Sequence, residues 1–254
     1  MLELHHWEPN AAAARVLITL KEKGLDFQSR YVDVLGFEQH GPDFLKLNES
    51  GETPVLVEDG EPLNESSYIC EYLDEAYPSP ALMPADPLGR WAARCWQKYV
   101  DDHLAASVSE LAWGAYRPAG LNGGDISLQA AIDKIPARER RDVWAEAVKG
   151  YDEAQLEKDR GRVKLAVEKM EADLGRSEWL AGSAFSLADI AVFAYANYLP
   201  RLTPDLVNAE VSPRVMAWLE RVAQRPAVKA ALAMGRADEP YAAAAPGPEH
   251  VRWG

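Results

Sequence analysis

The segment Thr53-Pro54-Val55 constrains the fold of this chain more than any other stretch. Proline has no N–H group to donate to a β-ladder, so it belongs where a chain enters a strand or turns. Val55–Glu58 and Glu61–Asn64 read as short strands joined by an Asp-Gly turn. Residues 66–76 then show the apolar periodicity of a helix. Strand, turn, strand and helix in this order predict an α/β unit.

The N-terminal residues extend this unit. Leu2–Leu4 reads as a strand, and Ala11–Lys23 reads as a helix that begins after Asn10, a favourable N-cap. Phe27–Val34 is predicted to return as a strand and Phe37–Leu47 to form an irregular helix. We therefore expect a first domain over residues 1–80, followed by a proline-rich linker over residues 81–89.

The remaining residues, 90–254, are predicted to form an all-helical domain with an insertion at 115–160 and a Pro/Ala-rich tail. Apolar periodicity predicts helices over residues 90–113, 126–132, 139–149, 155–174, 188–197, 211–224 and 227–235. Ser186 and Asp189 have the spacing of a capping box, to which we assign a folding role only.

Composition and charge exclude several classes of protein. The formal net charge of −13 argues against binding to nucleic acid or anionic membranes. No apolar run reaches the roughly 20 residues of a membrane span, and the N-terminus lacks signal-peptide features. Cys70 and Cys95 are predicted to be reduced thiols, which favours a cytoplasmic location. No His, Cys and carboxylate cluster has metal-ligand spacing, so we predict no metal.

Five residues around the strand entry are suited to a small peptide-like ligand. If the Thr53–Pro54 peptide bond is cis, the backbone of Val55 faces outward and can pair with a peptide. Glu65 offers a carboxylate to an ammonium group, and Ser66 offers a hydroxyl and a helix-terminal N–H to a carboxylate. Together they predict a receptor for a zwitterionic amino-acid head with a peptide bond behind it.

This pattern resembles the glutathione transferase superfamily over the full length of the chain. The resemblance implies an α/β thioredoxin-like N-terminal domain followed by an all-α C-terminal domain. Within the superfamily the chain looks most like the bacterial lignin β-etherases. The matching runs are Leu20–Phe27, Phe37–His40, Glu65–Ser66, Ile69–Leu73, Pro84–Pro87, Tyr99–Asp102, Ser186–Ile190 and the insertion around Trp144. The resemblance implies glutathione as cosubstrate and a dimer, either a homodimer or a heterodimer with a related chain.

The thiol of glutathione must be activated, because a free thiol with a pKa of about 8.5 is mostly protonated at neutral pH. The family uses Ser, Cys or Tyr at the start of the first helix, where this chain has Ala11, Ala12 and Ala13. Three substitutes remain open: the backbone N–H groups of these alanines, the Asn10 amide, or positive charge from Arg15 or His6.

A second departure concerns the glycyl carboxylate of glutathione. The family favours Lys or Gln two residues before the strand-entry proline, where this chain has Glu52, and like charges repel. Glu49 also replaces a usual proline. By resemblance, Gln39 and His40 remain candidates for binding that carboxylate.

The second substrate is expected between the first helix and the long helix of the second domain. The candidate pocket residues are His6, Trp7, Trp113, Tyr116, Trp144 and Tyr198. Aromatic walls suit aryl rings, but the same aromatic residues are equally typical of an interdomain core. The resemblance implies attack by the thiolate on the carbon that bears an aryloxy group next to a ketone, with release of a phenol. The alternative, favoured by the alanine run and Glu52, is a catalytically weakened subunit that stabilises a sister chain or binds ligand.

Overall fold

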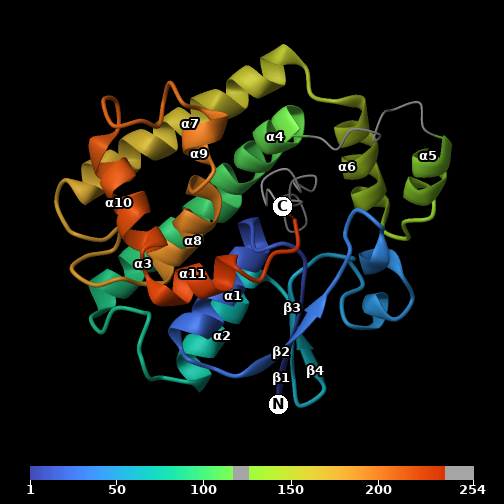
Figure 1. The fold of residues 1–254 in the computed structure, drawn as a ribbon, viewed down its shortest axis with the longest axis horizontal. Coiled ribbons are helices and arrows are strands. Elements are labelled where there is room, and N and C mark those ends of the chain that lie inside the picture. Colours follow the sequence, from blue (N-terminus) through green and yellow to red (C-terminus); the bar gives the residue numbers. More distant parts are fainter. Residues whose placement is uncertain (117–125, 238–254) are drawn as a thin grey trace.

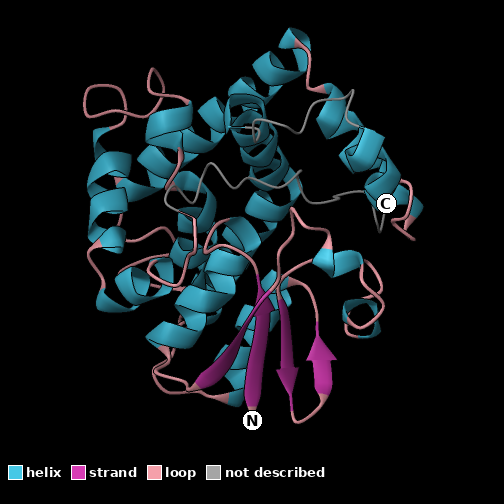
Figure 2. Ribbon diagram, turned by 45° about the vertical axis from the view of Figure 1, so that its right-hand side comes forward, coloured by secondary structure: helices cyan, strands magenta, loops and turns pink. Residues whose placement is uncertain are grey.

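The computed structural model describes residues 1–116 and 126–237. Its sheet has four strands in the order β2-β1-β3-β4 and lies at one end of the molecule (Figure 2). The strands are β1 (Leu2–His6), β2 (Phe27–Tyr31), β3 (Val55–Glu58) and β4 (Glu61–Leu63). β1 runs parallel to β2 and antiparallel to β3. The sequence predicted an α/β unit with these strands; β1 is longer than the predicted Leu2–Leu4, and β2 is shorter than the predicted Phe27–Val34.

Helices cover the two faces of the sheet because its side chains alternate. Leu4 and Leu56 pack into the main core with helices α1 (Ala11–Glu22) and α2 (Ser66–Ala76). Val55 and Val57 point to the other face, where they pack against Phe44. That face carries two short 3₁₀ helices, η1 (Glu38–His40) and η2 (Phe44–Lys46), where the sequence predicted one irregular helix.

The second part of the chain is helical. It consists of α3 (Pro87–Tyr99), α4 (Ala105–Tyr116), α5 (Ile126–Ile132), α6 (Arg138–Lys149), α7 (Glu153–Leu174), α8 (Leu187–Ala196), α9 (Leu199–Leu202), α10 (Pro213–Ala223) and α11 (Pro226–Leu232) (Figure 1). The helix predicted over 90–113 is α3 and α4 joined by a π-helical turn at Val100–Leu104. The prediction missed this turn and α9, because a π turn only shifts the phase of an apolar stripe and four residues show no period.

Helix α8 is the centre of the helical part, and all its side chains are buried. The predicted capping box is present: Ser186 and Asp189 exchange hydrogen bonds between side chain and backbone at the start of α8. Asp189 also accepts hydrogen bonds from the Leu180 N–H at 3.0 Å and from Trp218 Nε1 at 2.9 Å. One buried carboxylate therefore ties three segments of the helical core together.

Arg15 joins the two parts of the chain. Its side chain is 2% exposed, and Nη1 donates to Asp101 Oδ1 and to Ser67 Oγ, both at 2.6 Å. Ser67 Oγ donates in turn to Asp101 Oδ2 at 2.7 Å. The guanidinium also lies 5.0 Å from the centre of the Tyr195 ring. Of the roles open to Arg15, the structure shows a buried link between α1, α2 and the π-helical turn.

None of the helices in the described ranges is both long enough and apolar enough to cross a bilayer. Within the same ranges, no three His, Cys, Asp or Glu side chains are grouped so that they could hold a metal ion.

Candidate functional site

The strand entry at Pro54 has the geometry on which the predicted peptide receptor depends. The Thr53–Pro54 peptide bond is cis. Val55 follows it as the first residue of β3, opposite His5 of β1. The pairing of β3 with β4 begins one residue later, at Leu56. Val55 therefore lies just beyond the end of β4, where an extended ligand can reach its backbone.

Glu65 and Ser66 lie at the start of α2. Glu65 is exposed and has φ 68° and ψ 102°, a conformation that is costly for a residue with a side chain and is typical of ligand sites. Arg15 Nη1 lies behind them, 3.5 Å from Ser66 Oγ. Nε and Nη2 of Arg15 are buried and have no hydrogen-bond partner among the described residues. A carboxylate, a hydroxyl and a buried cation thus meet at one helix start.

The start of α1 provides the backbone donors that the sequence suggested. Ala14 N–H donates to the Asn10 carbonyl at 3.1 Å, so the N–H groups of Ala11, Ala12 and Ala13 precede the hydrogen-bond ladder of the helix. Asn10 occupies the N-cap position with extended backbone, but its side chain makes no capping hydrogen bond. Asn10 is therefore the N-cap by position and backbone only, and the expected capping by its side chain is absent. Ala11 has φ 44°, a second strained residue at this site.

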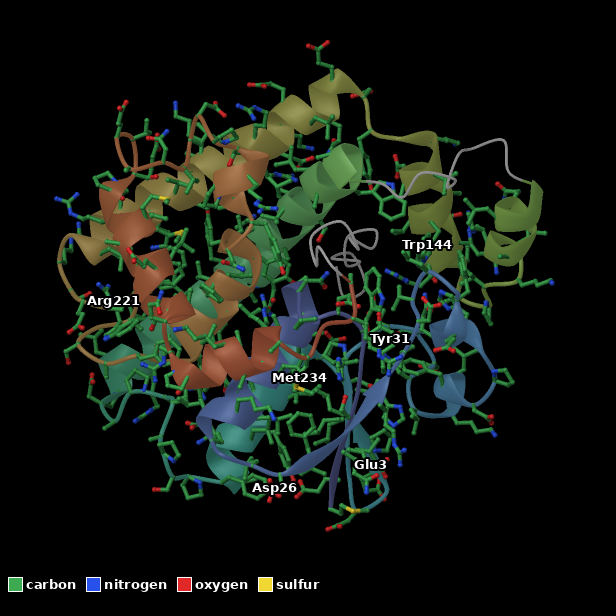
Figure 3. All side chains as sticks on the ribbon, viewed as in Figure 1. Glu3, Asp26, Tyr31, Trp144, Arg221 and Met234 are labelled. Carbon is green, nitrogen blue, oxygen red and sulfur yellow. The ribbon has the colours of Figure 1, made fainter. Side chains whose placement is uncertain are left out.

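A C-terminal segment crosses the loop before α1. The buried carboxylate of Glu8 accepts hydrogen bonds from the Arg236 N–H at 3.0 and 3.1 Å and from the Ala237 N–H at 3.2 Å. Tyr31 O–H donates to the same carboxylate, and the Arg236 guanidinium lies 3.9 Å from the Tyr31 ring centre (Figure 3). The sequence analysis missed Glu8 and Arg236, since no local pattern relates residues 228 positions apart.

His6 lies within the sheet. It is 1% exposed, its Nε2 is 2.7 Å from Ser29 Oγ, and its Nδ1 contacts the Trp7 carbonyl. Burial lowers the pKa of His6. The ring is therefore neutral at pH 7 with both nitrogens engaged, which does not favour His6 as the source of positive charge for a thiolate.

Gln39 and His40 line the other end of the strand entry. Gln39 Nε2 donates to the Val34 carbonyl at 3.1 Å, while its Oε1 is buried without a partner in the described structure. Both ring nitrogens of His40 are likewise buried without a partner there. Gly51, with φ 66°, allows this packing, because a Cβ at that position would lie 2.3 Å from His40 Nδ1. Burial, with a smaller contribution from Arg140, lowers the pKa of His40 to about 4, so the ring is neutral at pH 7.

Glu52 forms an ion pair that the sequence analysis did not foresee. Arg140 Nη1 of α6 lies 3.2 Å from Glu52 Oε1, and the Arg140 side chain is 6% exposed. The two residues are 88 positions apart, so no local spacing indicates the contact. Glu52 therefore does not face the predicted site as an isolated negative charge.

Three of the predicted pocket residues, Trp7, Trp113 and Trp144, lie in one buried cluster. Figure 3 labels Trp144 on α6. The rings of Trp113 and Trp144 are 5.8 Å apart and both residues are fully buried, while Trp144 packs 4.8 Å from Phe37. Tyr198 is also buried, just before α9. The side chain of Tyr116 lies outside the described part of the structure. These rings therefore have the burial of an interdomain core.

Comparisons with known proteins agree with this architecture. Residues 11–76 match the model of the glutathione S-transferase N-terminal domain, and residues 105–226 match the model of the glutathione S-transferase C-terminal domain. The chain belongs to the glutathione S-transferase family, and glutathione is the cosubstrate of this family. The predicted thioredoxin-like and helical parts are thereby confirmed.

Particular relatives extend over nearly the whole chain. Protein LigF of a Sphingobium species is 37% identical over 90% of this chain and 91% of its own length. Glutathione S-transferase 3 of Zea mays is 30% identical over 91% of this chain and 93% of its own length. The crystal structure of β-etherase LigF covers 92% of this chain and 99% of the LigF chain, with a TM-score of 0.87 and 36% identity.

Proposed function

We propose that this chain is a glutathione-dependent β-etherase that acts on β-aryl ether ketones derived from lignin. The observation that carries the proposal is the end-to-end similarity to LigF, in sequence and in structure. The strand entry, the start of α2 and the start of α1 supply the groups that such a reaction needs. The experiment that tests the proposal is release of a phenol by the purified chain with glutathione.

Glutathione is proposed to lie between the start of α2 and the strand entry. Glu65 accepts hydrogen bonds from the γ-glutamyl ammonium, and Ser66 donates to the γ-glutamyl carboxylate. The buried guanidinium of Arg15, 3.5 Å behind the Ser66 hydroxyl, adds positive potential there. The cysteinyl peptide unit pairs with the backbone of Val55, which directs the thiol toward α1.

The reaction proceeds by displacement. The thiol loses its proton to solvent, and the thiolate is stabilised by the N–H groups of Ala11, Ala12 and Ala13 together with the helix dipole. The sulfur forms a bond to the carbon that bears the aryloxy group, and the bond from that carbon to oxygen breaks. The phenolate leaves and takes a proton from solvent. The aromatic cluster of Trp7, Trp113 and Trp144 is proposed to support the aryl rings from beneath.

Introducing serine at position 11, 12 or 13 is expected to raise the rate of phenol release at neutral pH in at least one variant. A well-placed hydrogen bond to a charged group contributes about 1.5–3 kcal/mol, which lowers a thiol pKa by about one to two units. Rates of the three variants measured from pH 6 to pH 10 check this. The gain should disappear at high pH, where the thiol ionises unaided. An equal gain at every pH would contradict activation through the thiol pKa.

The second candidate function is a weakened subunit that stabilises a sister chain or binds ligand. The alanine run at the start of α1 favours it, because no side-chain hydroxyl is present there. The same rate measurement separates the two functions. A chain that binds glutathione but releases no phenol, with no serine variant active, is the weakened subunit.

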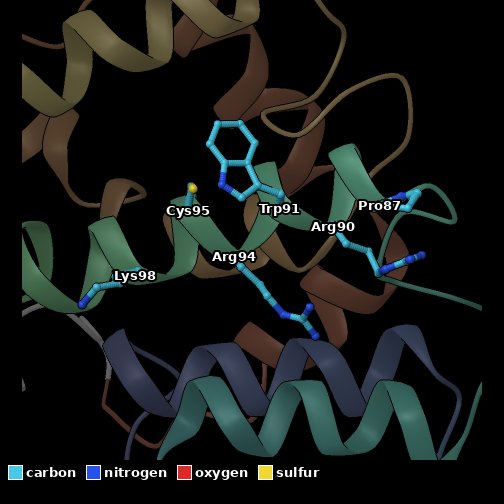
Figure 4. Close-up of a pocket in the computed structure, with 6 residues that line it drawn as sticks. All are labelled: Pro87, Arg90, Trp91, Arg94, Cys95 and Lys98. Carbon is cyan, nitrogen blue, oxygen red and sulfur yellow. The ribbon is translucent and has the colours of Figure 1, made fainter.

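We further propose that the chain forms a dimer through α2 and α3. Tyr68, Leu88 and Trp91 are 73%, 71% and 63% exposed on these helices. A groove of about 450 Å³ runs along α3, lined by Pro87, Arg90, Trp91, Arg94, Cys95 and Lys98 (Figure 4). Large exposed apolar side chains beside a groove are typical of protein interfaces.

The free thiols of Cys70 and Cys95 support the prediction of a reducing, cytoplasmic environment.

Trp91→Arg is expected to convert the dimer into a monomer, because it places a charge in the apolar centre of the interface. Analytical ultracentrifugation at micromolar concentration should show the unmodified chain at twice 28.1 kDa and the variant at 28.1 kDa. Leu165→Arg is the matched control, since Leu165 is 61% exposed on α7, a helix that is not part of the proposed interface. An unmodified chain that sediments only at 28.1 kDa contradicts the dimer.

A further inference from the structure

The ion pair between Glu52 and Arg140 occupies a fixed position beside the strand entry. Asn48 Nδ2 donates to the Glu52 carbonyl at 2.9 Å, and Asn48 Oδ1 accepts from Ser50 Oγ at 2.6 Å. These bonds hold the backbone of Glu52 directly before Thr53. The guanidinium of Arg140 therefore reaches from α6 to Glu52, two residues before Pro54 and its cis peptide bond.

Polar atoms without partners are concentrated around this pair. Gln39 Oε1, both ring nitrogens of His40 and Trp144 Nε1 are buried, and none of them has a hydrogen-bond partner among the described residues. Phe37 connects them, since its ring lies 6.1 Å from His40 and 4.8 Å from Trp144. Buried polar groups are nearly always satisfied, so a group of unsatisfied ones indicates a place where a polar ligand binds.

Arg140 belongs to the same face of α6 as one of these unpartnered groups, the indole of Trp144. Arg140 and Trp144 are four residues apart and so lie on the same side of α6. Arg140 is close enough to His40 to help lower the pKa of that ring. A guanidinium has five N–H donors in a planar fork, so one arginine can serve two carboxylates at once.

We propose that Arg140 binds the glycyl carboxylate of glutathione and that Glu52 holds its guanidinium in position. The inference rests on the proposed glutathione site. With the γ-glutamyl end at Glu65 and the cysteinyl unit on Val55, the third residue of the tripeptide extends past Pro54 toward Glu52. In an acidic chain with a net charge of −13, an anionic ligand needs a local cation, and Arg140 places one beside Glu52.

This assignment gives α6 a function in ligand binding. Helix α6 is then a wall of the glutathione site as well as part of the aromatic cluster. It also accounts for Glu52, which takes the place of a Lys or Gln in the family pattern. The positive charge is supplied by α6 instead, and the carboxylate of Glu52 holds it in position.

The test compares glutathione with glutathione glycinamide, in which an amide replaces the glycyl carboxylate. Titration calorimetry on the unmodified chain should show at least a tenfold preference for glutathione, because a hydrogen bond between charged groups is worth about that factor or more. Arg140→Gln should bind the two ligands equally, within a factor of two. Arg138→Gln is the matched control, since Arg138 is 81% exposed on the same helix, and it should keep the full preference.

Glu52→Gln tests the same charge balance without altering Arg140, should Arg140→Gln not fold. It removes the carboxylate that holds the Arg140 guanidinium, so the preference for glutathione over the glycinamide should fall by about threefold or more, while binding of the glycinamide stays unchanged. An unchanged preference in Glu52→Gln contradicts the positioning role of Glu52. An unmodified chain that binds both ligands equally, or an Arg140→Gln variant that keeps the preference, overturns the assignment while the proposed function stands. If the unmodified chain binds neither ligand, the proposed function fails, and the role of Arg140 fails with it.

Discussion

Replacing Asp189 by alanine should lower the free energy of unfolding by about 3–5 kcal/mol. The carboxylate is fully buried and accepts hydrogen bonds from the Leu180 N–H, the Ser186 N–H and Oγ, and Trp218 Nε1 at 2.9–3.2 Å. Alanine leaves all these donors buried without an acceptor. Since α8 contacts α1, α3 and α10, the loss weakens both parts of the chain.

Urea unfolding followed by tryptophan fluorescence measures this loss. Asp205→Ala is a suitable control, because Asp205 is 58% exposed and pairs with Arg160 at the surface. Such exposed pairs contribute less than about 1 kcal/mol. If Asp189→Ala lowers the free energy of unfolding no more than Asp205→Ala does, the hydrogen bonds of Asp189 do not stabilise the helical part as expected.

Replacing Glu65 and Ser66 together by alanine should weaken glutathione binding at least tenfold, or about 1.4 kcal/mol. The change removes the partner of the γ-glutamyl ammonium and one donor to the γ-glutamyl carboxylate. Alanine also carries a Cβ, so the backbone strain at φ 68° is the same in the variant and only the contacts with the ligand are lost.

Titration calorimetry gives the affinities, and Glu61→Ala is the control because Glu61 is exposed on the neighbouring strand β4. Unfolding curves of the double variant should match those of the unmodified chain, which shows that α2 still forms. Unchanged glutathione affinity in the double variant would place the ligand elsewhere.

Local sequence patterns predicted most of the backbone. Val55–Glu58 and Ser66–Ala76 have the predicted bounds, because turn chemistry and apolar periodicity act over a few residues. The capping box of α8 was also visible in the sequence, since both its residues lie within one turn. The division into domains at residue 80 stays a prediction.

The charged contacts of the site could not be predicted from local sequence patterns. Arg140 lies 88 residues after Glu52, and Arg236 lies 228 residues after Glu8, so only the folded chain brings them together. The same holds for Trp113 and Trp144, whose complete burial depends on how α4 and α6 pack. Asn10 shows the limit of a local rule: its type and backbone suit an N-cap, yet its side chain does not cap α1.

The chain departs from the family pattern at Glu52 and at the alanines that begin α1, and the structure affects the interpretation of the first. Glu52 is balanced by Arg140, so it does not by itself oppose glutathione. The start of α1 still lacks a side-chain hydroxyl, and the proposed activation of the thiol relies on backbone N–H groups and the helix dipole. The activity of the unmodified chain is therefore the decisive property.

That property is measured by incubating the purified chain with glutathione and a β-aryl ether ketone and following both products by liquid chromatography with mass detection. We expect phenol and glutathione conjugate to appear in equal amounts, with none formed when glutathione or the chain is omitted. The rate should rise with pH until the bound thiol is fully ionised. A chain that binds glutathione yet forms neither product at any pH would contradict the proposed β-etherase.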